Sequence, residues 1–230
     1  MLISIILYIS GFIGFIVGGL ILLITAMISQ KLMFQYIYYF CHIVMFCMGV
    51  RINIKGEFPN KQGPFVIMSN HGSFIDVFVV PPSIQGKFTA IVAAKNLKIP
   101  LFGSLLKKIK AVPIIRDNKE AAMQSIKLAE KVIHEDKYHM VILPEGTRTL
   151  DGKLQKFKKG GFHMAINTGA PILLIAHQDT YLYKPKNRWI LSPRTINVVI
   201  GPIIETDGYD SNNIRELVDK TWNEMNNLLK

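Results

Sequence analysis

The chain falls into two parts that differ in how hydrophobic and polar residues are spaced. Residues 1–50 form two apolar stretches, 2–29 and 32–50, separated only by Gln30 and Lys31. As a helix, residues 2–29 would be about 42 Å long, which exceeds the roughly 30 Å hydrocarbon core of a bilayer. The pattern therefore predicts two membrane-embedded helices in residues 1–50, forming a hairpin that either spans the bilayer or dips into it and returns.

From residue 51 onward, short apolar runs alternate with amphipathic segments. Strand-like runs occupy 51–55, 65–69, 88–93, 111–115, 140–143, 172–176 and 195–200. The runs at 141–143 and 172–175 are continuously apolar, which indicates burial on both faces. Helical periodicity covers 118–135 and 211–229. This alternation predicts one α/β domain over residues 51–230, with a single mixed, mostly parallel sheet flanked by helices.

Composition separates the two parts further. The 230 residues are 50% hydrophobic and carry a net charge of +11, which excludes an intrinsically disordered chain. Lys31 is the single charged side chain in residues 1–50, so residues 51–230 form a basic domain. No nucleic-acid motif accompanies that charge, and we expect no nucleic-acid partner. The basic charge is consistent with binding to anionic lipid headgroups, with binding of acidic substrates, and with a solvated basic face that has no specific role.

The N-terminal stretch is read better as an anchor than as a signal peptide. A signal peptide has a basic segment before its apolar core, and no Lys or Arg precedes Lys31. Arg51, Lys55 and Lys61 follow the second apolar stretch, so the positive-inside rule places the domain on the cytoplasmic face of the membrane. The only cysteines, Cys41 and Cys47, lie in the apolar part, which excludes a disulfide scaffold and a Cys-rich metal site.

The first candidate site follows the apolar strand at 65–69. His71 is followed by Gly72 and, five positions after the histidine, by Asp76. If a turn at Gly72 leads into a helix, Asp76 comes round to face His71. A carboxylate on one imidazole nitrogen fixes the tautomer and leaves the other nitrogen to take a proton from a hydroxyl, which here would belong to a substrate. The alternative is that Asn70 caps a helix and His71 only packs.

The second candidate site, Pro144-Glu145-Gly146-Thr147-Arg148, again follows an apolar strand. Proline ends the strand, glycine permits an unusual turn, and the arginine fork suits a phosphate. Glu145 could orient that arginine or a substrate, and the alternative is an exposed turn with a surface ion pair. Arg116 ends another apolar run, so His71, Arg116, Glu145 and Arg148 are expected at the same edge of one sheet, where α/β folds bind ligands.

These motifs together resemble those of the glycerolipid acyltransferase family, especially the members that acylate 1-acylglycerol-3-phosphate. Residues 157–160 and 169–172 resemble the later blocks, and the resemblance covers about residues 50–205 in the family's order. It implies that His71 is the general base and Asp76 its orienting partner. It also implies that Glu145, Gly146, Thr147 and Arg148 bind the phosphoglycerol of the acceptor, with Arg116 as a further phosphate contact.

The resemblance implies transfer of a fatty acyl group from acyl-CoA or acyl carrier protein to the sn-2 hydroxyl of lysophosphatidate at a phospholipid membrane, giving phosphatidate. We expect no metal and no cofactor, because the thioester donor is already activated. Three alternatives stay open. They are an acyltransferase for glycerol-3-phosphate or another lysolipid, a metal-dependent hydrolase using His71, Asp76 and Glu145, and a non-catalytic lipid-binding protein at the membrane surface.

Overall fold

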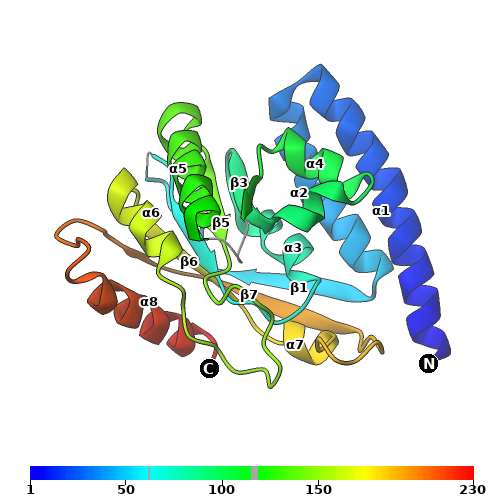
Figure 1. Cartoon of the computed structure of the whole chain (residues 1–230). Helices are drawn as coiled ribbons and strands as arrows, with labels where there is room; N and C mark the ends of the chain where they lie inside the picture. The colour runs from blue at the N-terminus through cyan, green and yellow to red at the C-terminus, as the bar shows by residue number, and fades with distance from the viewer. Residues whose placement is uncertain (62, 115–118) are drawn as a thin grey trace.

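In a computed structural model that describes residues 1–61, 63–114 and 119–230, a sheet of seven strands lies between two layers of helices (Figure 1). The strand order is β1-β7-β6-β2-β5-β3-β4. The strands are β1 Val50–Lys55, β2 Val66–Ser69, β3 Phe88–Ala93, β4 Val112–Ile114, β5 His139–Ile142, β6 Ile172–His177 and β7 Arg194–Ile204. All seven predicted strands are present, with boundaries shifted mostly by one or two residues.

The sheet is mixed and mostly parallel, as predicted. β2 pairs in parallel with both β5 and β6, and β3 pairs in parallel with β5 and β4. Among the strand pairs of the described residues, only β6 and β7 are antiparallel, because β7 runs back alongside β6. On its other side, β7 pairs in parallel with β1. Every residue of β2 and β6 is buried, whereas β5 is only partly buried and its apolar run is less enclosed than expected.

Helices cover both faces of this sheet. α5 Lys119–Asp136, α6 Gly160–Thr168 and α8 Ile214–Leu228 pack on one face, where residues such as Ile133, Phe162 and Leu217 share a core with β2 and β6. The opposite face is covered by α2 Gln30–Cys47, α3 Asp76–Val79 and α4 Phe102–Lys108, with α1 Leu2–Ile28 outside them (Figure 1). A further short helix, α7 Thr180–Tyr183, follows β6.

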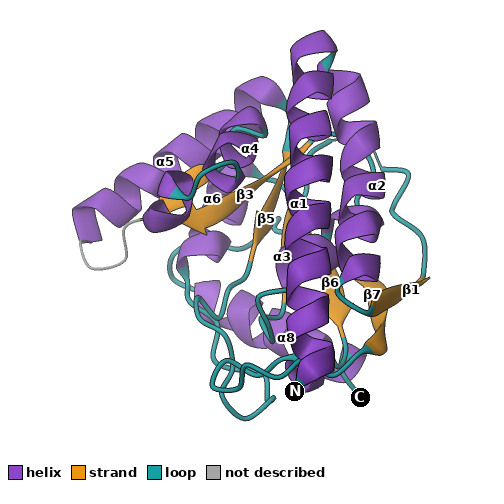
Figure 2. Cartoon of the chain, turned by 90° about the vertical axis from the view of Figure 1, so that its right-hand side faces the viewer, coloured by secondary structure: helices purple, strands orange, loops and turns teal. Residues whose placement is uncertain are grey.

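The two N-terminal helices are α1 Leu2–Ile28 and α2 Gln30–Cys47, which lie side by side (Figure 2). Ser29, whose backbone is extended, is the only residue between them. The link is therefore shorter than the predicted Gln30-Lys31, and α2 begins at residue 30 instead of residue 32. Among the helices of the described residues, α1 alone is long and apolar enough to cross a membrane.

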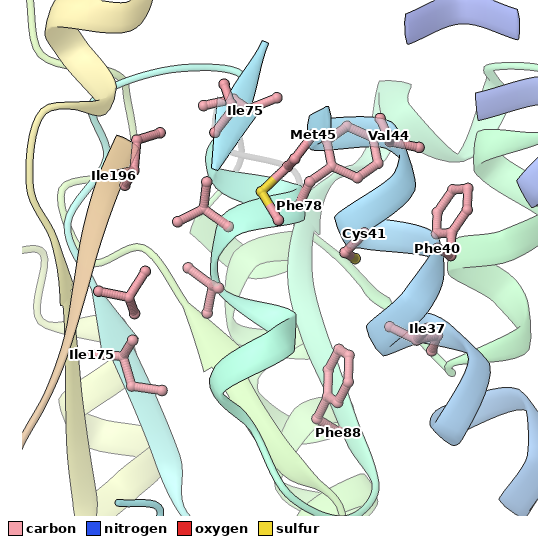
Figure 3. Close-up of a cluster of buried hydrophobic side chains, with 14 of the residues drawn as sticks. Ile37, Phe40, Cys41, Val44, Met45, Ile75, Phe78, Phe88, Ile175 and Ile196 are labelled. Carbon is pink, nitrogen blue, oxygen red and sulfur yellow. The ribbon is translucent and has the colours of Figure 1, made fainter. Parts of the chain in front are cut away.

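α2 is part of the protein core. Residues of its buried face, among them Phe40 and Val44, belong to one hydrophobic core with Ile75, Ile175 and Ile196 of the domain (Figure 3). The predicted boundary at residue 50 stays a prediction, but the hydrophobic packing across it is continuous. The helical pair is therefore joined to the sheet along the length of α2, rather than hanging from it by a linker.

The parallel strands β2, β5 and β6 end at the same edge of the sheet. The segments that follow them are residues 70–75, 143–159 and 178–179, the last leading into α7. Two of these segments carry the candidate motifs of the sequence. The parallel pairing is what brings motifs more than 70 residues apart in sequence to one place.

Candidate active site

His71 and Asp76 form a hydrogen-bonded pair. The distance from His71 Nδ1 to Asp76 Oδ2 is 2.7 Å, and the aspartate side chain is almost fully buried while 22% of the histidine side chain is exposed. Asp76 is the first residue of α3, and both of its oxygens also accept the main-chain N–H of Ser73. The pair predicted from the five-residue spacing therefore exists, with its protonatable ring facing a cleft and its carboxylate inside the protein.

The surroundings of Asp76 favour its ionised form. Burial raises the pKa of the carboxyl, but the His177 ring, the hydrogen bond and charge of His71 and the Ser73 N–H outweigh it and hold the pKa below its ordinary value. An ionised Asp76 keeps the Nδ1 hydrogen of His71 directed toward itself. The other ring nitrogen, Nε2, is then left to accept a proton.

Glu145 links the segment after β5 to the turn that carries His71. Its Oε1 accepts the main-chain N–H of His71 at 2.6 Å, and its Oε2 accepts the main-chain N–H and the side-chain amide of Gln155 at 3.0 and 3.2 Å. The main-chain N–H of Thr149 in turn donates to the carbonyl of His71 at 3.0 Å. The sequence led us to expect this carboxylate on the acceptor, but both oxygens are occupied by the protein's own donors because residues 143–149 fold back on the turn after β2.

The turn at 143–146 requires its glycine. Gly146 has φ +72°, and its N–H donates to the carbonyl of Leu143 at 2.9 Å. A Cβ at this position would lie 2.9 Å from Cε of Lys158, whose side chain lies against the turn. Glycine therefore supplies both the left-handed conformation and the space for that lysine.

Arg148 is half-buried and makes no hydrogen bond or ion pair with any described residue. Lys184, which follows α7, lies close enough to Arg148 and to Arg188 for their charges to act on it: burial, then repulsion by Arg148 and Arg188, lowers the pKa of Lys184. Lys186 lies beside the same turn, with its Nζ 3.4 Å from Thr147 Oγ1. These four cations have no carboxylate partner within the described part of the chain, so the site is electropositive and open to an anion.

The remaining predicted residue, Arg116, lies outside the described residues. The strand that leads toward it, β4, is the edge strand furthest from β1. Two strands, β5 and β3, separate β4 from β2 in the sheet.

Sequence reasoning missed the second histidine beside Asp76. His177 ends β6, is fully buried, and its Nε2 is 3.7 Å from Asp76 Oδ1. Asn70, considered above as a helix cap, instead brackets the main chain of His177: its amide donates to the His177 carbonyl, and its oxygen accepts the His177 N–H, both at 2.9 Å. The only local signal was a polar residue at the end of an otherwise apolar strand.

The His71 side chain lines a cleft of about 350 Å³ whose walls come from the segments after β2, β5 and β6. Among the described residues, no group of three or more His, Cys, Asp or Glu side chains gathers as a metal site would require. In particular, Glu145 faces main-chain N–H groups rather than the His71–Asp76 pair. The arrangement is that of a general base, held by a buried carboxylate at the wall of a cleft, with a group of cations on neighbouring segments.

Comparison with known proteins agrees with this geometry. Residues 51–178 match the model of the Acyltransferase family. Proteins named 1-acyl-sn-glycerol-3-phosphate acyltransferase are similar in sequence: that of Cocos nucifera is 32% identical, covering 77% of this chain and 57% of the relative, and that of Pseudomonas aeruginosa is 32% identical, covering 74% and 65%. The protein from Limnanthes douglasii is 34% identical, covering 76% and 62%.

The fold is also that of a solved structure. The crystal structure of the 1-acyl-sn-glycerophosphate acyltransferase PlsC from Thermotoga maritima superposes with a TM-score of 0.80 at 22% identity, covering 97% of this chain and 95% of that chain. The chain thus spans more than half, but less than two thirds, of the length of the first three sequence relatives, and nearly all of the solved structure.

Proposed function

This chain belongs to the Acyltransferase family, and from that premise we propose that it transfers a fatty acyl group from a thioester donor to the free sn-2 hydroxyl of 1-acylglycerol-3-phosphate. The observation that carries the proposal is the 2.7 Å contact between His71 and the buried Asp76 at the wall of the cleft. The activity for which the sequence relatives are named supports the choice of acceptor.

In the proposed reaction, His71 acts as the general base. Its Nε2 takes the proton of the acceptor hydroxyl as the hydroxyl oxygen attacks the thioester carbonyl carbon. A C–O bond forms, the C–S bond breaks, and the proton passes from the imidazolium to the leaving thiolate. Asp76 stabilises the imidazolium while it exists and holds the ring in one tautomer. The donor is acyl-CoA or acyl carrier protein, and no cofactor is required.

We assign the phosphate of the acceptor to the cations beside the cleft. Arg148 has a planar guanidinium group without a partner in the described chain, and its charge acts on the neighbouring Lys184. Gly146 and Thr147 lie between this arginine and Glu145 in the sequence, and we assign them to the same phosphate contact. Glu145 contributes indirectly, because its hydrogen bond fixes the main chain of His71. Arg116 stays a predicted further contact.

The proposed place of reaction is the surface of a phospholipid membrane, with the domain on its cytoplasmic face. α1 exposes a row of large apolar side chains, among them Ile6, Ile9, Phe12 and Ile13. A surface of this kind is stable in contact with acyl chains. The acceptor and the acyl group both reside in the bilayer, so attachment there brings the cleft to its substrates.

The test is acyl transfer by detergent-purified protein with long-chain acyl-CoA or acyl carrier protein, in the presence of a chelator. Acceptors would be lysophosphatidate, glycerol-3-phosphate and another lysolipid. We expect phosphatidate as the main product, and a rate lowered about 10²–10⁴-fold by His71→Ala. His134→Ala, on the exposed side of α5, is the matched control and should retain the wild-type rate.

Each alternative gives a different result. Preference for glycerol-3-phosphate or another lysolipid would change the acceptor but not the chemistry. Loss of activity in chelator would favour a metal-dependent hydrolase. Equal rates for His71→Ala and wild type would contradict the general-base mechanism, and lipid binding without turnover would identify a binding protein.

A further inference from the structure

The carboxylate of Asp76 lies between two imidazole rings. On one side its Oδ2 contacts His71 Nδ1 at 2.7 Å, and on the other its Oδ1 faces Nε2 of His177 at 3.7 Å. Nε2 of His177 is completely buried and has no hydrogen-bond partner among the described residues. A buried polar atom without a partner is costly, and this one is directed at the carboxylate of the proposed catalytic pair.

The surroundings of His177 determine which ring nitrogen carries the hydrogen. Its Nδ1 lies 3.1 Å from Thr180 Oγ1, and its Nε2 faces the negative charge of Asp76. A bare nitrogen lone pair directed at a carboxylate would be repelled, so the hydrogen belongs on Nε2. Nδ1 then accepts the hydroxyl hydrogen of Thr180.

His177 is neutral at physiological pH. Burial lowers the pKa of its ring, and this effect outweighs the opposing attraction of Asp76, while His71 adds to the lowering. In the described chain, the charged groups that act on the His177 ring are Asp76 on α3 and His71 on the preceding turn. The same two rings are the titratable groups that act on Asp76. His177 therefore presents a neutral N–H to the carboxylate, and not a second positive charge.

The position of His177 relative to the pair is fixed by its neighbours. Asn70, directly before His71, holds both main-chain groups of His177 at 2.9 Å. Gly72, directly after His71, is packed against Thr180 so closely that a Cβ would lie within 3 Å of the threonine hydroxyl. The residues on either side of His71 thus clamp the end of β6, and the two rings keep their places on opposite sides of Asp76.

We infer that His177 is a positioning residue for acyl transfer: its neutral Nε2–H holds Asp76 toward His71 and withdraws part of the carboxylate's charge. The inference rests on the proposed function, because it assigns His177 a role in the same reaction. Without this N–H, the undiminished negative charge of the carboxylate acts on His71. His71 would then hold its proton more tightly, and a higher pH would be needed to free the base.

The test compares His177→Leu, which removes the N–H, with His177→Gln, which retains a neutral N–H donor. The readout is kcat/KM against pH, where the acid-side midpoint marks deprotonation of the base. We expect His177→Leu to move that midpoint upward by about half a pH unit or more, the size of a modest electrostatic contribution. His177→Gln should restore the midpoint to within a few tenths of wild type.

His163→Leu, a half-buried histidine on α6, is the matched control and should leave the midpoint unchanged. A purely structural role would lower the amount of folded enzyme without moving the midpoint. A wild-type midpoint in His177→Leu, or an equal shift in His177→Gln, would overturn the inference. Should His177→Leu fail to fold, His177→Met removes the same N–H donor and introduces a flexible side chain that adapts to its surroundings.

An NMR titration of the His71 ring in isotope-labelled protein provides the same comparison without substrate. It separates the two possible failures. If wild type transfers no acyl group to any acceptor, the proposed function is wrong. The upward movement of the ring titration in His177→Leu, and its absence in His177→Gln, still decides the role of His177.

Discussion

The two buried carboxylates near His71, Asp76 and Glu145, have pKa values shifted in opposite directions. Asp76 receives two imidazole rings and a main-chain N–H, which together lower its pKa despite burial. Glu145 receives donors from Gln155 and His71, but burial outweighs them and its pKa is raised. The difference follows from the partners, because Asp76 is hydrogen-bonded to the His71 ring, which can become a cation, whereas the donors to Glu145 are amide N–H groups, which cannot. Asp76 is thus suited to stabilise an imidazolium, while Glu145 is suited to hold a loop.

His139 gives a residue-scale prediction about acid stability. Its ring stacks on Phe65, and its Nδ1 accepts the Phe65 main-chain N–H at 3.0 Å. Burial lowers the pKa of this ring from 6.5 to about 4. Between those values the unfolded chain binds a proton that the folded chain does not, so stability is greatest above pH 6.5 and falls as the pH drops toward 4.

We expect His139 to account for up to about 3 kcal/mol of stability lost across that range. The measurement is the thermal unfolding midpoint at pH 7 and pH 4.5 for wild type and for His139→Asn, which retains an acceptor for the Phe65 N–H. The lowered pKa values of Asp76 and His177 also make stability fall as the pH drops, and the raised pKa of Glu145 has the opposite effect. The quantity compared is therefore the change in unfolding midpoint between pH 7 and pH 4.5 in each protein. An equally steep decline in the variant would contradict the assignment to His139.

The residue pairs that could be predicted from the sequence are those close together in it. Asp76 is five positions after His71, so turn geometry alone suggested their contact. His177 is about 100 residues from Asp76 and follows an apolar strand, so only the pairing of β6 with β2 reveals its neighbour. The role of Glu145 was assigned to the substrate because the sequence does not show that the turn folds back onto His71.

At the scale of elements, long periodic segments could be predicted and short helices could not. The strands β3 and β6 and the helices α5 and α8 follow apolar patterns that local sequence displays. The helices α3, α4 and α7 have four to seven residues, too few to be stable alone, and they form because the surrounding core holds them. The direction of β7 was likewise undetermined, since strand propensity carries no information on pairing.

Close packing of α1 on α2 gives an element-scale prediction. A Cβ on Gly18 would lie 2.7 Å from the ring of Phe40, which belongs to the core face of α2. Gly18→Val should therefore separate the two helices and lower the stability of the protein by about 1–3 kcal/mol, as overpacking does. Thermal unfolding in detergent measures the loss.

Leu20→Val places the same β-branched residue at an exposed position of the same helix and is the control. It should change stability by less than about 0.5 kcal/mol. If both variants unfold at the same temperature, the approach of α1 to α2 does not depend on glycine.

At the scale of the whole molecule, α1 is attached to the domain at several points along its length. Near its start, Ser4 accepts the main-chain N–H of Leu191 and Tyr8 donates to the carbonyl of Trp189. Further along, Phe15 contacts Phe78, and a Cβ on Gly19 would meet the side chain of Leu101. If α1 keeps these contacts, crossing a bilayer would draw the flank of the domain into the hydrocarbon, so we expect α1 not to span the membrane.

This attachment predicts that α1 lies along the membrane surface with its apolar row in the lipid. Both ends of the helix would then be on the same side as the domain. Single cysteines at Leu2 and Lys31, in a background of Cys41→Ala and Cys47→Ala, should both react with a membrane-impermeant maleimide in intact vesicles. Lys220→Cys on α8 is the control for the domain side.

A spanning helix would give a different labelling pattern, since one of the two ends would react only after the vesicles are opened. Phe12→Cys, in the exposed apolar row, should react slowly in vesicles and quickly in detergent if that row contacts lipid. Rapid reaction of Phe12→Cys in intact vesicles would contradict lipid contact, and protection of one end alone would contradict the surface orientation. In the predicted orientation, the first turns of α1 hold the segment after α7 at the membrane, and this segment supplies the cations Lys184, Lys186 and Arg188 beside the cleft.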